Sequence, residues 1–298
     1  MDKKKFRKLL ESEGLAPRTV NFYIESVHAV EKILENGGME TAPRKIGKAE
    51  ILYLLEYCKA KDFTMQTRKG YFSSLRKYCI IFGSSKVSEW PRIRLPPDRR
   101  PNATWLTPDQ AKALLSAEMD PKQKVVVHLE LCLGLRHVEV IRLRVHDIDD
   151  IHGLIRVRGK GPQGDKPRTL PYTFGTAEAI ASWVAVREDL VERSKKRYPI
   201  SATIPDELIV WERKDILHPY SEEGYGLDKV VCLKLSDQLG FHITNHALRR
   251  TFGRALYHSG VKIETISAIM GHESTQETLN YIGLGLDDMR AALENFRM

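Results

Sequence analysis

Apolar residues recur at helical spacing through the first 83 positions, so this part of the chain is predicted to be helical. One helix is expected to begin at Pro17, because proline suits the first turn of a helix. Its apolar stripe consists of Val20, Tyr23, Ile24, Val27, Val30 and Ile33. Two further helices are expected, one around the apolar run 51–55 and one along the stripe of Tyr71, Leu75, Tyr78 and Phe82.

Residues 88–104 interrupt this pattern with four prolines and four arginines. Proline removes backbone donors and stiffens the chain, so the segment is predicted to be a cationic linker. The following Thr107-Pro108-Asp109-Gln110 combines a capping box with proline at the first helical position, which indicates a helix start. The predicted organisation is a helical domain over 1–88, a linker over 89–104 and a second domain over 105–298, ending in a tail over 282–298.

The second domain is expected to be mainly helical with one small antiparallel sheet. Residues 148–157 are interpreted as two strands around a turn at 150–153, and residues 168–171 as a third strand. A glycine-rich turn, residues 158–166, lies between them. Helices are predicted to resume at Thr176. Residues 189–240 look polar and irregular, and the sequence indicates no role for them.

Charge is divided unevenly along the 298 residues, whose formal net charge is +8. Residues 1–100 hold 21 Lys and Arg against 12 Asp and Glu, a net charge of +9, and the remainder has a net charge of −1. This imbalance indicates an anionic partner, nucleic acid first of all, and a basic surface that only keeps the protein soluble is the alternative. On the helix expected over 68–82 the polar side is almost all cationic, which suits a phosphate backbone or, alternatively, a merely solvated face.

Several kinds of site find no support in the sequence. The four cysteines form no C-x-x-C pair and no zinc spacing, so they indicate small apolar residues in a reducing cytoplasm. The N-terminus has no apolar signal core, and no apolar run approaches the roughly 18 residues that cross a bilayer. A P-loop and a dinucleotide fingerprint are also missing. We therefore expect a cytoplasmic protein with no membrane segment, no metal and no nucleotide cofactor.

Five short motifs in the second domain carry candidate chemistry. They are Gly134-Leu135-Arg136 with Glu139, Lys160 in the glycine-rich turn, His246-Ala247-Leu248-Arg249, Gly271-His272, and Tyr281. Each alone has an ordinary explanation, such as a structural Arg–Glu pair, an exposed lysine or a packed aromatic ring. Together they suit phosphoryl transfer, because paired arginines can clamp a phosphate and tyrosine can attack phosphorus. Histidine can accept the phenolic proton, and lysine can donate a proton to a departing sugar oxygen.

On these residues the chain resembles the tyrosine recombinases of the phage-integrase and Xer type, over essentially its whole length. The family boxes G-L-R-x-x-E and H-x-L-R match 134–139 and 246–249, and V-x-G-K-G followed by R-x-x-P matches 157–161 and 168–171. The L-G-H box appears as Met270-Gly271-His272, and Tyr281 follows that histidine by nine residues. The T-x-x-x-Y of the family's core-binding domain appears as Thr19 to Tyr23.

The resemblance implies a mainly α fold, with an N-terminal helical, SAM-like core-binding domain and a C-terminal mixed α/β catalytic domain that carries a small antiparallel sheet. It implies that Tyr281 is the nucleophile and His246 the base or proton relay. Lys160 would be the acid, with Lys166 as its rival, while Arg136, Arg249 and His272 would stabilise the transition state. The implied activity is site-specific recombination through a 3′-phosphotyrosine and a Holliday junction, without metal or ATP.

The implied partner is double-stranded DNA with a specific site. Predicted DNA-binding residues are Arg68, Lys69, Arg76, Lys77, Arg92, Arg94, Arg99, Arg100 and Arg168. The tail carries an apolar stripe of Leu286, Met289, Leu293 and Phe296, for which the resemblance favours packing on a neighbouring protomer of a synaptic tetramer over packing on its own domain. An accessory protein is possible. The alternatives are a type IB topoisomerase-like strand transferase and a non-catalytic DNA-binding relative, and the choice between chromosome dimer resolution and integration or excision stays open.

Overall fold

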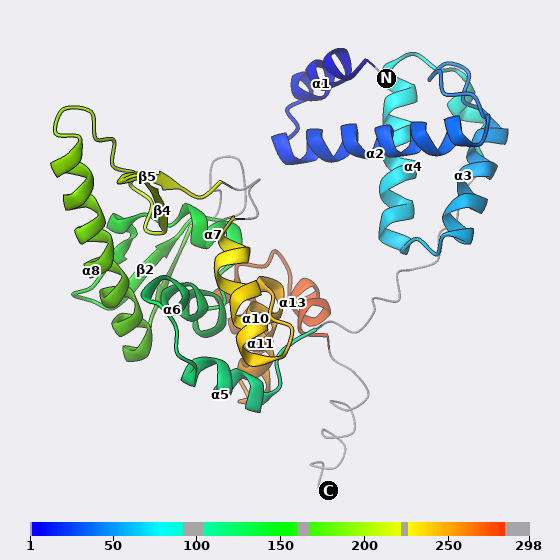
Figure 1. Ribbon diagram of the computed structural model, residues 1–298. Helices are drawn as coiled ribbons and strands as arrows, with labels where there is room; N and C mark the ends of the chain where they lie inside the picture. Colours follow the sequence, from blue (N-terminus) through cyan, green and yellow to red (C-terminus); the bar gives the residue numbers. More distant parts are fainter. Residues whose placement is uncertain (1, 92–103, 160–166, 222–225, 284–298) are drawn as a thin grey trace, which may run out of the picture. The chain divides into compact units, whose positions relative to one another are not determined.

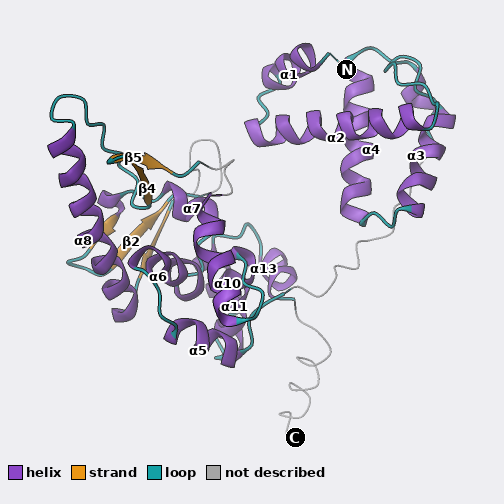
Figure 2. Cartoon of the chain, in the orientation of Figure 1, coloured by secondary structure: helices purple, strands orange, loops and turns teal. Residues whose placement is uncertain are grey.

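The computed structural model describes residues 2–91, 104–159, 167–221 and 226–283 (Figure 1). The chain divides into two compact units, residues 1–100 and 101–298. Among the described residues helices dominate both units, and strands occur only in the second (Figure 2). No helix in these ranges is both long and apolar enough to span a bilayer.

Four helices build the first unit. They are α1 (Lys3–Ser12), α2 (Pro17–Asn36), α3 (Lys48–Ala60) and α4 (Met65–Ile81), followed by a 3-10 turn over Lys86–Glu89. The predicted helices are thus confirmed, including the start of α2 at Pro17. One side of each helix enters a common core, in which the rings of Phe6 and Tyr78 meet edge to face at 5.0 Å between centroids.

The second unit begins with two helices that start at capping boxes, α5 (Pro108–Ser116) and α6 (Pro121–Val127). At the first, the Thr107 hydroxyl accepts from the backbone of Gln110 at 3.2 Å, and the Gln110 side chain accepts from the Thr107 backbone at 2.9 Å, as predicted. A π-helical turn over His128–Cys132 continues α6, and α7 (His137–Arg142) and a 3-10 turn over Val145–Asp147 follow.

The predicted three-stranded antiparallel sheet is confirmed. Its strands β1 (Ile148–Asp149), β2 (Leu154–Val157) and β3 (Arg168–Pro171) lie in sequential order. Ile155 of β2 pairs with Ile148 on one side and Leu170 on the other, and Val157 pairs with Arg168. Burial alternates along β2, which places Ile155 and Val157 in the core.

The interpretation of residues 189–240 as irregular was wrong. This stretch contains the end of α8 (Phe174–Arg197), the hairpin β4 (Val210–Arg213) and β5 (Ile216–Pro219), α9 (Gly226–Asp228), a π-helical turn over Lys229–Leu233, and α10 (Lys234–Leu239). The hairpin turn is made by Lys214 and Asp215, both with positive φ, at 54° and 61°. Such turns usually contain glycine or asparagine, so the sequence carried no turn signal here.

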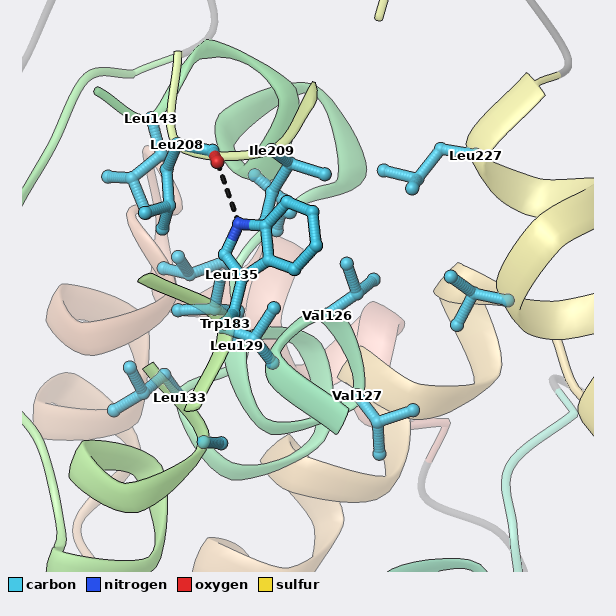
Figure 3. Close-up of a cluster of buried hydrophobic side chains, with 14 of the residues drawn as sticks. Val126, Val127, Leu129, Leu133, Leu135, Leu143, Trp183, Leu208, Ile209 and Leu227 are labelled. Carbon is cyan, nitrogen blue, oxygen red and sulfur yellow. Dashed lines mark hydrogen bonds between the residues drawn. The ribbon is translucent and has the colours of Figure 1, made fainter. Parts of the chain in front are cut away.

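Trp183 of α8 anchors the main core of the second unit (Figure 3). Its indole nitrogen donates to the backbone carbonyl of Leu208 at 2.8 Å, which ties the segment before β4 to α8. Around the ring lie Val126 and Leu129 of the helix before Gly134, together with Leu135 and other apolar side chains (Figure 3). Since these residues are buried, their packing fixes the position of the backbone on both sides of Gly134.

The last three helices form a smaller core of their own. They are α11 (Asn245–His258), α12 (Ile263–Met270) and α13 (Thr275–Ile282). Ile266, Met270 and Ile282 are fully buried between them, and Phe252 and Tyr281 pack against this cluster. This small core therefore fixes the end of α13 against α11.

Candidate active site

Arg136 is positioned by a break in the apolar helix. Gly134 has a φ of +64°, in the left-handed region that glycine tolerates best. A Cβ at this position would also collide with the Phe252 ring of α11. Glycine is therefore required both by the backbone conformation and by the space available. The chain is extended again at Arg136, which is the N-cap of α7.

Glu139, in the first turn of α7, binds three arginines. Arg136 Nη1 donates to its Oε1 at 3.0 Å, so the predicted pair is present. Arg168 makes a bidentate pair with both oxygens, at 3.0 and 2.9 Å, and Arg249 Nη1 lies 3.7 Å from Oε2. Burial by itself raises the pKa of Glu139, but the guanidinium groups, Arg168 foremost, outweigh it and hold the pKa below its usual range. The carboxylate is therefore ionised at neutral pH.

The same three arginines bind the C-terminal end of α12. The three hydrogen bonds run from Arg168 Nε to the carbonyl of Ile269 (2.7 Å), from Arg249 Nη2 to that of Met270 (2.6 Å) and from Arg136 Nη2 to that of Gly271 (2.9 Å). The last carbonyls of a helix lack intrahelical partners and carry partial negative charge. The guanidinium groups are thus held between one carboxylate and one helix end, which fixes their positions.

Gly271 makes this arrangement possible. It ends α12 with a φ of +62°, a left-handed C-cap. A Cβ here would lie 2.8 Å from Arg168 Nη1, closer than a side chain tolerates. The glycine of the Gly271-His272 motif is therefore required by its backbone conformation and by the approach of an arginine.

Arg249 is almost completely enclosed, with 2% of its surface exposed. Its Nη1 donates to the carbonyl of Gly134, and its Nη2 contacts Nε2 of His272 at 3.0 Å. Burial, reinforced by the nearby positive charge of Arg136, lowers the pKa of Arg249 to about 10. It still carries its charge at neutral pH.

His272 is held as a neutral ring. Arginine has no acceptor, so His272 Nε2 accepts from Arg249 and Nδ1 must carry the proton. Nδ1 then donates to Thr278 Oγ1 at 2.8 Å, and this hydroxyl donates to the carbonyl of Ser274 at 3.4 Å. Burial and the charge of Arg249 lower the pKa of His272 to about 4, in agreement with a neutral imidazole.

Tyr281, near the end of α13, lies beside a proton acceptor. Its hydroxyl is 3.3 Å from Nδ1 of His246, which is at the start of α11. Desolvation raises the pKa of Tyr281, and the positive charges of Arg249 and Arg250 partly counter this effect. Desolvation, assisted by the same two arginines, lowers the pKa of His246, so its ring is neutral and can accept a proton. The structure thus brings together five of the six predicted catalytic residues: Arg136, His246, Arg249, His272 and Tyr281.

The sixth residue, Lys160, and its rival Lys166 lie outside the described residues. The same holds for the predicted DNA-binding residues Arg92, Arg94, Arg99 and Arg100 and for the apolar stripe of the tail. Their roles stay predictions.

The described cations of α4 have different surroundings. Lys69 and Arg76 are exposed and, seven residues apart, share a face of the helix. Arg68 Nε donates to the carbonyl of Phe63 at 2.8 Å, and Lys77 Nζ lies 2.5 Å from a carboxylate oxygen of Glu13. Lys69 and Arg76 are therefore the better placed of the four for a phosphate backbone.

Two features of the candidate site carry no signal in the sequence, and one predicted DNA-binding residue has contacts that the sequence did not indicate. Arg168 was predicted to bind DNA, which stays a prediction, but its guanidinium is already engaged with Glu139 and α12. Arg250 follows the H-x-L-R motif and lies with its Cζ 5.1 Å from the centroid of the Tyr281 ring. No spacing signal marks this residue, because its partner is 31 positions away in the sequence.

The second missed feature is a polar network behind the site. Nδ1 of His137 lies 3.1 Å from Oε1 of buried Glu130, and its Nε2 lies 3.5 Å from Asp228. Asp228 in turn accepts from the side chain of Asn245, the first residue of α11. The network links the helix before Gly134, the start of α7 and the start of α11, which carry the site. Within the described ranges, no group of three or more His, Cys, Asp or Glu side chains is arranged to hold a metal ion.

Comparison with known proteins gives one family and several relatives. Residues 104–285 match the model of the phage integrase family. Tyrosine recombinase XerA of Thermococcus onnurineus is 27% identical over 295 residues, which cover 97% of this chain and 93% of the relative. Tyrosine recombinase XerC of Vibrio parahaemolyticus is 23% identical over 246 residues, which cover 78% of this chain and 71% of the relative.

Solved structures are similar over nearly the whole chain. XerH site-specific recombinase bound to palindromic difH substrate aligns with a TM-score of 0.67 and 17% identity, covering 99% of this chain and 84% of that one. The Tn1549 transposon integrase in complex with transposon right end DNA aligns with a TM-score of 0.65 and 19% identity, covering 99% and 98%. These similarities confirm the predicted fold class, mainly helical with a small antiparallel sheet.

Proposed function

The chain belongs to the phage integrase family of tyrosine recombinases, and from this premise we propose that it recombines DNA at a specific site through a 3′-phosphotyrosine on Tyr281 and a Holliday junction. The observation that carries the proposal is the contact of the Tyr281 hydroxyl with Nδ1 of His246, at 3.3 Å. A phenol needs a base to become a nucleophile at neutral pH, and a neutral imidazole within reach can serve.

In the proposed cleavage step the phenolic proton passes to His246 Nδ1. The phenolic oxygen forms a bond to phosphorus while the bond from phosphorus to the 5′-oxygen breaks. The departing oxygen takes a proton from a general acid, for which we propose Lys160. Since the covalent phosphotyrosine keeps the energy of the phosphodiester bond, a 5′-hydroxyl of a partner duplex can reverse the step without ATP.

Arg136 and Arg249 would stabilise the transition state. The site supports this role because Glu139 and the end of α12 hold both guanidinium groups in place before any substrate arrives. Donors fixed in advance stabilise developing charge without the cost of reorganisation. His272 would help chiefly by orienting Arg249, to which its neutral ring is hydrogen-bonded.

We propose duplex DNA as the partner, with the first unit and the linker binding its backbone. The net charge of +9 over residues 1–100 and the exposed cations Lys69 and Arg76 support this role. The XerH and Tn1549 proteins of similar fold are bound to DNA in their structures, which also favours it. We further propose, from the tail stripe, that protomers assemble as a tetramer on two recombination sites.

The test is a trapping assay on nicked duplexes that carry the recombination site. The wild-type chain should form a covalent adduct at a 3′-phosphate in buffer with EDTA and without ATP, and Tyr281→Phe should form none. No adduct with the wild type, or an undiminished adduct with Tyr281→Phe, would contradict the proposal. Strand exchange between two marked duplexes, rather than relaxation of supercoils alone, should then separate a recombinase from a type IB topoisomerase-like enzyme.

A further inference from the structure

Arg250 differs from the other arginines near Tyr281 in how its donors are used. Arg249 donates to the carbonyls of Gly134 and Met270 and to His272, and Arg136 donates to Glu139 and Gly271. Within the described ranges the buried Nε of Arg250 has no hydrogen-bond partner. A buried donor on a charged group without a partner is costly, so its presence calls for an explanation.

The guanidinium of Arg250 lies over the aromatic ring of Tyr281. Its Cζ is 5.1 Å from the ring centroid, closer than the 5.6 Å of Arg249. A cation at this distance from a ring face is attracted to it and helps to hold the ring. Its attraction increases when the ring's oxygen acquires negative charge, because a full charge then replaces a quadrupole.

We propose that Arg250 is a further catalytic residue, which holds the Tyr281 ring and stabilises the negative charge that develops on the phenolic oxygen during attack on phosphorus. The proposal rests on the function proposed above for Tyr281. The stabilisation grows from the neutral phenol to the transition state, so it accelerates the reaction rather than merely tightening the ground state. Arg250 acts electrostatically: the phenolic proton still goes to His246, and Arg250 neither gains nor loses one.

Arg250 also acts on the base. Its positive charge opposes protonation of His246 and favours ionisation of Tyr281, so it lowers the pKa of both groups. At His246 this adds to the effect of burial, and at Tyr281 it opposes the effect of burial. Other groups facing this pair come from several elements. They are Arg249 of α11, Arg136 and His137 at the start of α7, Asp228 of α9, and His272 after α12.

The experiment measures the rate of covalent adduct formation on a nicked duplex between about pH 5 and pH 9, with Arg250→Gln and Arg250→Lys. Arg193→Gln is the matched control, since Arg193 has an exposed ion pair with Asp189 on α8, far along the chain from the site motifs. Thermal unfolding and DNA binding of each variant are measured in parallel.

We expect Arg250→Gln to react about tenfold to a hundredfold more slowly than the wild type at neutral pH. The acid limb of its pH profile should move about one unit to higher pH, because His246 without the neighbouring cation keeps its proton longer. Arg250→Lys retains the charge, so its acid limb should stay near that of the wild type even if its rate falls. Arg193→Gln should match the wild type.

Two results would overturn the role of Arg250. One is a rate of Arg250→Gln equal to that of Arg193→Gln. The other is a loss by the same factor at every pH, shared by Arg250→Lys, which indicates only a structural role. Failure of the proposed function gives a different result. In that case the wild-type chain forms no adduct, or Tyr281→Phe forms one, and both results are seen without any Arg250 variant.

Discussion

Glu130 and Glu139 lie on either side of Gly134, nine residues apart, and both are buried in the second unit. Burial raises the pKa of both carboxyl groups, yet the net shifts have opposite directions. At Glu130 burial prevails, because among the described residues its carboxylate has one hydrogen-bond partner, His137, and its Oε2 has none. At Glu139 the guanidinium groups of three arginines prevail. Donor number, rather than depth, decides whether a buried glutamate here carries charge.

The charges around the two glutamates also differ, and this difference suits them to different roles. Around Glu139 three positive charges face one negative charge, and the partial charge of the α12 end offsets only part of the excess. A positive excess held in fixed geometry suits an arriving phosphate. Around Glu130 the neighbours are His137 and, beyond it, Asp228, so this network has no surplus of positive charge to offer. The Glu130 network links the helix before Gly134 to the starts of α7 and α11, whereas Glu139 binds three arginines of the candidate site.

The largest effect is expected from Glu139→Gln, which removes the charge that three arginines share. The variant should lose about 3 kcal/mol of unfolding free energy and about a hundredfold in cleavage rate. Because the folded pKa of Glu139 is depressed, its contribution to stability is present above the unfolded pKa of about 4.3 and is lost as pH falls through the folded pKa. Urea unfolding at pH 7 and at pH 3 should therefore show a difference between wild type and variant that shrinks in acid.

The matched control for this prediction is Glu192→Gln, an exposed position on α8. It should leave both stability and cleavage unchanged. If Glu139→Gln behaved like this control, the carboxylate would not be the common anchor of the arginines.

A second large effect is expected from Gly271→Ala, which disturbs the end of α12, where the three arginines donate to backbone carbonyls. Alanine must adopt a φ of +62° and its Cβ must displace Arg168, so we expect a loss of about 2 kcal/mol and a slower cleavage. Gly240→Ala is the control, because Gly240 also ends a helix with positive φ, at 73°, but has open space around its Cβ position. Equal losses in cleavage for both variants would show that backbone strain, and not Arg168, is responsible.

Arg168→Lys tests whether the bidentate pair matters beyond its charge. Lysine is a point donor and cannot bind both oxygens of Glu139 and the carbonyl of Ile269 together. Cleavage should fall about tenfold while DNA affinity, measured by titration with a labelled duplex, stays the same. Weaker binding with unchanged cleavage would instead support the direct DNA contact that the sequence suggested.

The sequence motifs indicated the residues of the candidate site, but not the residues that hold these side chains in place. Helix starts at Pro17 and Thr107 and the sheet strands follow from local spacing, and so they could be predicted. The pairing of Arg168 with Glu139 was not predicted, because the two residues are 29 positions apart and pairing across that distance has no periodic signature. The 214–215 turn was missed because it uses Lys and Asp where glycine is usual. The turn was thus missed for a local reason, whereas the pairing of Arg168 with Glu139 depends on tertiary contact.

The smallest effect is expected from Glu130→Gln, although this carboxyl is fully buried. Its raised folded pKa means that the native state binds the proton more tightly than the unfolded chain does. Its contribution to stability is therefore full below the unfolded pKa of about 4.3 and is lost as pH rises through the folded pKa.

Glutamine imitates the neutral acid at every pH, so the Glu130→Gln variant should match the wild type near pH 4 and equal or exceed its stability at pH 8. Its cleavage rate should stay within about threefold of the wild-type rate. Urea unfolding at the two pH values tests this, and a loss at pH 8 as large as that of Glu139→Gln would mean that His137 keeps Glu130 ionised and that the two glutamates are alike.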